Sequence, residues 1–213
     1  MKKITASDFL ALGLYAFAGF GLEVLLSMVL PNLLGIKSSE YSTIHHCIHW
    51  VLTCVLWGSI TVFLLHLSKT KYSFDILKNN HVITPKGWLI AIIITVVSIM
   101  LTTIVCKGFK PVTEYNGLVK FIFQNIYYLF EAALIVLTII FGQRFGEVIT
   151  KKVNLPWGGL FLAMTWGLVH ILLQGLHTGI YTFIMAIFYG IVYVALNKNT
   201  KYSYILITLM FIL

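Results

Sequence analysis

Two glutamates lie inside long apolar runs, where a carboxylate is costly and chemically useful. Glu23 shares a helical face with Gly19 and Ser27, four residues away on either side. Glu131 has polar neighbours one or two helical turns earlier, namely Gln124, Tyr127 and Tyr128. A carboxylate in such a run must be paired, protonated or solvated, and it is therefore a candidate acid or base. For Glu23 a packing role is an equal alternative, whereas the neighbours of Glu131 favour function.

A second set of polar side chains follows later in the chain. Trp166, His170 and Gln174 are spaced by four residues, and His177 follows His170 by seven. If one helix continued through this segment, all four would form one stripe. Imidazole and amide groups lack hydrogen-bond partners in lipid, so the stripe should face the inside of the molecule. Each histidine is then a hydrogen-bonded core residue or part of an acid–base site, and we predict that Glu131, His170 and His177 share one polar cavity.

Other polar groups have simpler interpretations. His45 and His49 are spaced to share a metal ion, but no Cys or carboxylate completes four ligands, so we predict interfacial histidines with His46 and no metal site. Arg144 and Glu147, three residues apart, are typical of a solvated ion pair at a helix end. Arg144 remains a further buried polar candidate, together with Glu23 and Gln174, because it could close a polar site from that side.

Several chemistries have no support in the sequence. It contains no G-x-x-x-x-G-K-[ST] phosphate loop, no G-x-S-x-G elbow and no C-x-x-C-H haem motif. Cys47, Cys54 and Cys106 form no C-x-x-C pair and indicate buried thiols without a disulfide framework. No cofactor can be named. Gly175 and Gly179 form a G-x-x-x-G motif that favours close helix approach.

The elements that carry these residues are predicted to be membrane helices. With 59% hydrophobic and 10% charged residues, the chain cannot cover a water-soluble globule with polar surface. A bilayer core of about 30 Å requires about 20 helical residues. The sequence therefore predicts an all-α, polytopic transmembrane bundle of about seven segments, with the last one short, in a single domain over residues 1–213. The segments are 9–34, 44–67, 87–105, 121–141, 157–173, 180–196 and 202–213.

The distribution of basic residues predicts the orientation. The N-terminus and the second, fourth and sixth connections carry Lys2, Lys3, Lys69, Lys71, Lys78, Lys86, Arg144, Lys151, Lys152, Lys198 and Lys201, and the opposite side carries Lys37, Lys107, Lys110 and Lys120. Cytoplasmic connections are enriched in Lys and Arg, so we predict a cytoplasmic N-terminus on an uncleaved first helix. The +8 net charge thus indicates an anionic membrane surface rather than nucleic acid. Fourteen of the fifteen basic residues are Lys, a bias typical of AT-rich bacterial genomes.

Residues 127–213 resemble the CPBP family of polytopic intramembrane glutamate proteases, which comprises CAAX proteases and bacteriocin-processing enzymes and is also called the Abi family. Glu131 stands where that family has Glu-Glu-x-x-x-Arg, and the residues from Trp166 to His170 resemble its Phe-x-x-x-His motif. Position 132 is Ala, however, and Arg144 is about three turns beyond Glu131. In the last segment Thr208 is near the place of the expected His.

The resemblance implies that Glu131 is a general base, with His170 orienting a water or stabilising the oxyanion and His177 or Gln174 supporting them. The chain would then be a divergent member, either an active protease acting on a membrane-protein or peptide substrate or an inactive relative. An alternative from another class is a non-catalytic protein that binds or transports a small molecule or a proton through a cavity lined by Glu23, Glu131 and the two histidines. A third is a structural partner in a membrane complex.

Overall fold

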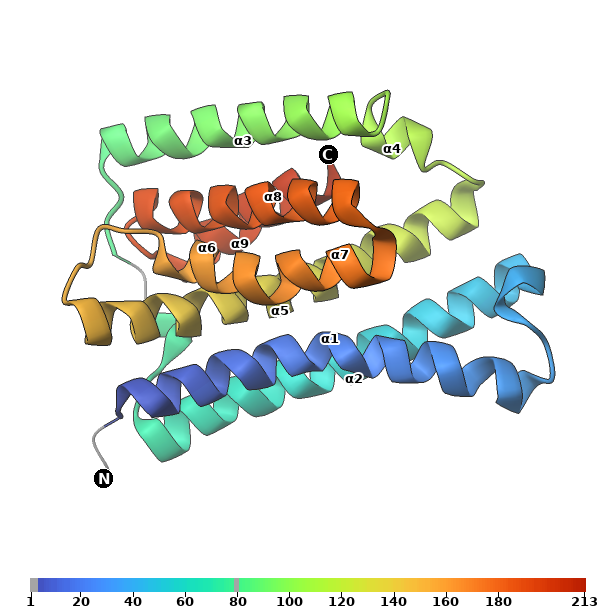
Figure 1. The fold of residues 1–213 in the computed structure, drawn as a ribbon, viewed down its shortest axis with the longest axis horizontal. Coiled ribbons are helices and arrows are strands. Elements are labelled where there is room, and N and C mark those ends of the chain that lie inside the picture. Colours follow the sequence, from blue (N-terminus) through green and yellow to red (C-terminus); the bar gives the residue numbers. More distant parts are fainter. Residues whose placement is uncertain (1–3, 79–80) are drawn as a thin grey trace.

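The computed structural model describes residues 4–78 and 81–213, which form helices joined by short connections and contain no strand (Figure 1). The long helices are α1 (Ala6–Leu34), α2 (Thr43–Tyr72), α3 (Pro85–Val105), α5 (Leu118–Thr150) and α8 (Leu176–Ala195). The shorter elements are η1 (Ser38–Glu40), η2 (Ile76–Lys78), α4 (Lys110–Thr113), α6 (Trp157–Leu162), the π-helical turn η3 (Ala163–Gly167), α7 (Leu168–Gln174) and α9 (Thr200–Ile212).

Six segments of the described chain are long and apolar enough to cross a membrane. They are α1, α2, α3 continued through α4, α5, the run from α6 through α7, and α8. The shortest of them has 18 residues, which at about 1.5 Å per residue reaches about 27 Å, close to the thickness of the hydrocarbon core. α9 has 13 residues and is too short for a full crossing. The prediction of an all-α, polytopic bundle with a short last segment is confirmed.

The connections alternate between the two ends of the bundle (Figure 1). The described start of the chain and the α2–α3, α5–α6 and α8–α9 connections lie at one end, and the α1–α2, α3–α5 and α7–α8 connections lie at the other. Most of the lysines used to predict the orientation are therefore collected at the first end. Lys2 and Lys3, which also belong to that prediction, lie outside the described residues.

The centre of the bundle is α5, which packs against α1, α2, α6 and α9. Its residues 134–143 are all buried. The close packing against α6 depends on small residues, because a Cβ atom on Gly158 would collide with the carbonyl oxygen of Ile139. α5 extends to Thr150, well beyond the predicted limit of residue 141. Residues 142–150, which were predicted to belong to a connection, are therefore helical.

This extension buries a charged cluster at the end of α5. Glu147, only 6% exposed, accepts from Arg144 at 3.1 Å and Lys198 at 2.5 Å, and it also accepts a hydrogen bond from Gln143 at 2.9 Å. The Gln143 amide in turn accepts from the Gly158 backbone N–H at 2.9 Å. The prediction of an Arg144–Glu147 pair is confirmed, but its description as a solvated pair is wrong, because α6 and the α8–α9 connection cover the carboxylate.

Candidate functional site

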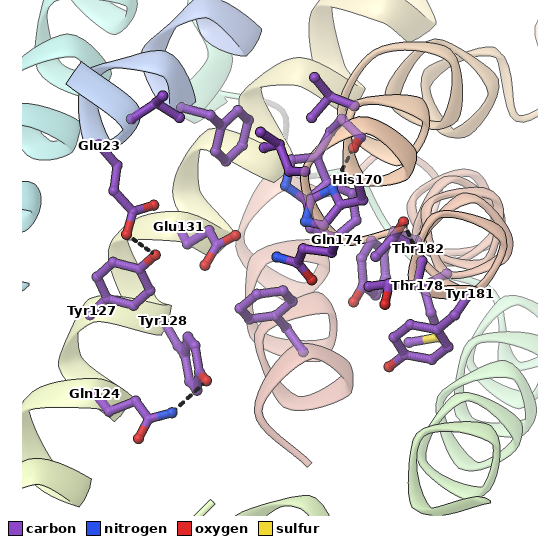
Figure 2. A pocket seen from close by; sticks show the side chains of 18 of the residues that line it. Glu23, Gln124, Tyr127, Tyr128, Glu131, His170, Gln174, Thr178, Tyr181 and Thr182 are labelled. Carbon is purple, nitrogen blue, oxygen red and sulfur yellow. Dashed lines mark hydrogen bonds between the residues drawn. The ribbon is translucent and has the colours of Figure 1, made fainter. Parts of the chain in front are cut away.

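A cavity of about 660 Å³ lies between α1, α5, α7 and α8 (Figure 2). Its polar lining includes Glu23 from α1, Glu131 from α5, and His170 and Gln174 from α7. This volume lies in the range of small-molecule sites. The two glutamates identified in the sequence, one histidine and one amide therefore face a common space.

Glu131 occupies the middle of α5 and is only 9% exposed. Trp166, which lies in the η3 turn, lines the cavity with it. Tyr127, one turn earlier on α5, lines the same cavity. In Figure 2 the Glu131 carboxylate points away from its helix towards the space beside Gln174. This carboxylate is thus enclosed by protein but directed into a cavity that has room for a water molecule and a ligand.

His170 is held by a backbone contact that fixes its tautomer. Its Nδ1 lies 2.6 Å from the carbonyl oxygen of Trp166, and because a carbonyl only accepts, Nδ1 must carry the hydrogen. The neutral ring then has an acceptor lone pair on Nε2. The imidazole also packs edge-on against the Trp166 indole, with ring centroids 4.5 Å apart. Trp166 therefore holds the histidine through its carbonyl and its ring, and it lines the cavity together with Glu131.

A π-helical turn precedes these residues. In η3 the hydrogen bonds span five residues instead of four, which changes the direction in which Trp166 and the following turn project. Such turns are frequent at functional sites. The turn is packed tightly, because a Cβ on Gly167 would come within 3.0 Å of the backbone of Phe183.

Glu23 is tied to α5 and α2. Its Oε1 accepts a hydrogen bond from the Tyr127 hydroxyl at 2.8 Å and lies 3.6 Å from Nε2 of His49. The Tyr127 ring packs on Trp57, with centroids 4.8 Å apart, and the Trp57 indole donates to the Gly19 carbonyl at 3.0 Å. These contacts connect α1, α2 and α5 beside the cavity and show how a carboxylate is accommodated in α1.

A third carboxylate, which the sequence analysis did not select, lies towards the α3–α5 connection. Glu114 accepts hydrogen bonds from Tyr128 at 2.9 Å and from Gln124 at 3.2 Å. Nearby, the Lys110 ammonium donates to the carbonyl of Phe211 at 2.6 Å. The sequence offers one signal for this group, since Lys107, Lys110 and Glu114 are the charged residues in a short connection that leads into the polar part of α5.

The cavity lining does not include three residues that were considered for the site from the sequence, namely His177, Arg144 and Thr208. His177 is exposed and does not line the cavity, because the chain breaks at Gly175, whose φ is +89°, and a new helix begins at Leu176. The stripe expected from one continuous helix is therefore interrupted after Gln174, and the prediction that His177 converges on this cavity is wrong. Arg144 is bound to Glu147 and is likewise absent from the lining. Thr208 is buried in α9 outside the cavity.

The histidines at the start of α2 have separate structural contacts. Nδ1 of His45 accepts from the Ser42 backbone N–H at 3.2 Å and forms part of the helix cap. The ring of His46 packs near Trp50, with centroids 5.7 Å apart, and His49 faces Glu23. Within the described residues, no three His, Cys, Asp or Glu side chains are grouped to hold a metal ion.

The fold and the cavity define the class of this chain as a multi-pass, all-α membrane protein. No family model, no curated protein and no solved structure matches it. Its function must accordingly be argued from the site.

Proposed function

We propose that this chain is a divergent CPBP-like intramembrane hydrolase that cleaves an amide bond with water activated by Glu131 and His170. The observation that carries the proposal is that both residues line one cavity, with the His170 ring held in a fixed tautomer by the Trp166 carbonyl. The Trp-x-x-x-His spacing and the buried Glu131 are the residues that resemble the family. The geometry thus agrees with the part of the resemblance that concerns the reacting groups.

The reaction can be written with these side chains. A water bound between the two residues donates one O–H to the Glu131 carboxylate and the other to Nε2 of His170, whose acceptor lone pair orients it. The water oxygen attacks the amide carbon as Glu131 takes its proton. The Gln174 amide, at the same cavity wall, supplies a donor for the oxyanion. Glu131 then passes the proton to the nitrogen of the leaving amine as the C–N bond breaks.

One observation favours hydrolysis over transport through the bundle. The lining residues that α5 contributes are Gln124, Tyr127, Tyr128 and Glu131, and none follows Glu131. Beyond it α5 is a buried apolar stretch, in which the Thr138 hydroxyl is bonded to the carbonyl of Leu134 at 2.8 Å. A route for an ion or proton would need polar groups towards both ends. The polar lining from α5 therefore extends from Glu131 towards one end of the helix only, which favours a catalytic site over a transport path.

The test is a cleavage assay with purified protein in lipid nanodiscs. A pool of membrane-spanning peptides would be incubated with the wild-type protein and with His170→Ala, and new termini would be mapped by mass spectrometry. We expect discrete cleavage sites that the wild type produces at least about tenfold faster than the variant. Equal cleavage by both proteins, or none by the wild type, would contradict the proposal.

We also propose that the end of the bundle with the basic connections faces the cytoplasm of a bacterial cell membrane. A cysteine placed at exposed Lys71, in a version lacking the three native cysteines, is expected to resist a membrane-impermeant maleimide added to intact cells. A cysteine at exposed Lys37, on the opposite end, is expected to react. The reverse labelling pattern would show that the orientation is wrong.

A further inference from the structure

The cavity carries more negative than positive charge. Its charged lining residues are Glu23, Glu114, Glu131 and Lys110. Within residues 4–78 and 81–213, none of these three carboxylates lies within ion-pair distance of a Lys or Arg side chain; Glu23 has only His49 at 3.6 Å. The Lys110 ammonium offsets part of this charge, but three carboxylates with one cation remain incompletely balanced inside a membrane bundle, so a cationic partner from outside the chain would stabilise them.

The donors beside these carboxylates are already used. The hydroxyl hydrogens of Tyr127 and Tyr128 are donated to Glu23 and Glu114. The Gln124 amide nitrogen donates to Glu114 and also to the Tyr128 hydroxyl at 2.7 Å. The hydroxyl and amide groups beside Glu23 and Glu114 therefore present acceptor lone pairs to the cavity. Lys110 keeps N–H groups beyond the one that it donates to Phe211, but a ligand that pairs with the carboxylates themselves must donate hydrogen bonds.

Glu131 gives independent support for a ligand. It is more than nine-tenths buried and directed into the cavity (Figure 2). A carboxylate has about four acceptor positions, which a donor in this space can use.

The cavity wall also has the aromatic surface that suits a cation. Aromatic rings are contributed by Phe17, Phe20, Trp50, Tyr127, Tyr128, Trp166, Tyr181, Tyr189 and Phe211. The molecule already contains one such arrangement, because the ammonium of Lys110 lies 4.7 Å from the ring centroids of both Tyr128 and Phe211. Ring faces attract cations, and they do so more strongly where water is excluded. Apolar side chains such as Leu173 and Met185 complete the wall and would contact an alkyl chain.

We propose that the cavity binds an alkylammonium group, a protonated amine on an apolar chain, between the Glu23 and Glu114 carboxylates and against the aromatic wall of the cavity. That this amine belongs to the hydrolysed substrate rests on the proposed function. The binding itself does not, because it requires no reaction.

Calorimetric titration of the purified protein in neutral detergent tests the site. The probes are hexylammonium, hexanol and hexanoate, each also titrated into protein-free micelles. We expect saturable binding of hexylammonium, tighter than that of the other two by about tenfold or more, or about 1.4 kcal/mol. Equal affinity for hexanol would mean that the site recognises only the alkyl chain, and this would overturn the proposal.

Charge-removing variants locate the site. Glu23→Gln and Glu114→Gln keep the shape and an acceptor oxygen for the tyrosines, and each should weaken hexylammonium binding by about fivefold or more. Glu40→Gln, an exposed change in the α1–α2 connection, is the matched control and should bind like the wild type. Folding would be verified by size-exclusion chromatography. Wild-type affinity in both cavity variants would overturn the proposal.

The outcomes separate this site from the proposed reaction. If the protein binds hexylammonium but cleaves no peptide, the ammonium-site proposal stands and the hydrolase proposal fails. If it cleaves peptides with and without an amine equally and binds no hexylammonium, only the ammonium-site proposal fails.

Discussion

Replacement of Glu131 by glutamine is expected to reduce amide hydrolysis by about 100-fold or more, because the amide cannot accept the proton of the attacking water. Glutamine keeps the size and shape of this buried side chain. The amount of folded protein should therefore remain close to that of the wild type. The rate would be measured with the fastest-cleaved peptide from the mapped pool.

The matched control for this change is Glu40→Gln, which removes an exposed carboxylate that does not line the cavity and should keep the wild-type rate. A Glu131→Gln protein that is folded and cleaves within about threefold of the wild-type rate would exclude Glu131 as the base. A loss of rate that is accompanied by aggregation would be resolved with Glu131→Asp, which keeps the base but shortens it.

The second large effect is on stability. Glu147→Ala is expected to lower the free energy of unfolding by about 2–4 kcal/mol, because it leaves Arg144 and Lys198 without their shared carboxylate. The lower part of this range reflects the partial exposure of Arg144, whose side chain is 35% exposed and can recover hydration. The change also removes one of the two acceptors of the Gln143 amide nitrogen, which also donates to the carbonyl of Leu155 and joins the end of α5 to the start of α6.

Thermal unfolding in detergent measures this effect against a surface ion pair. Lys69 lies 3.3 Å from Asp75 but is 63% exposed, so Lys69→Ala should change stability by less than about 1 kcal/mol. If Glu147→Ala were no more destabilising than Lys69→Ala, the buried cluster would have no special part in holding α5, α6 and the α8–α9 connection together.

The membrane fold and the inward direction of Glu131 could be predicted from the sequence. Both follow from the cost of polar groups in lipid, which acts on each helix separately and is visible in its composition. The pairing of Arg144 with Glu147 was equally local, since it depends on a spacing of three residues within one helix. The burial of that pair was not predictable, because it depends on α6 and Lys198, which pack against it from elsewhere in the chain.

The predicted position of His177 in the cavity is wrong because of a local backbone conformation that the helical spacing does not reveal. The spacing from Trp166 to His177 fits one helix, but Gly175 adopts a positive φ and ends α7 there. Gly179 of the same G-x-x-x-G motif has no room for a Cβ beside Ile171, so the motif closes the α7–α8 turn. A glycine can fill either a turn or a helix contact, and a single sequence does not distinguish these uses.

The contribution of Glu114 and Lys110 to the cavity could not be predicted for a different reason. Both lie close to the short α4 helix and reach the cavity only because α3, α5 and α9 converge there. The contact between Lys110 and Phe211 joins residues that are 101 positions apart. Such long-range placement depends on the packing of the whole bundle and leaves no periodic signal.

The central claim, that Glu131 and His170 activate water directly, is tested most directly by a single-turnover cleavage in H₂¹⁸O with enzyme in excess over the peptide. Direct attack by activated water places one ¹⁸O in the new C-terminal carboxylate, and mass spectrometry should find this label in nearly all of the product, with none in the Glu131 side chain. Unlabelled product together with ¹⁸O on Glu131 would contradict the account, because it would show that the carboxylate attacks the substrate itself and is released later by water.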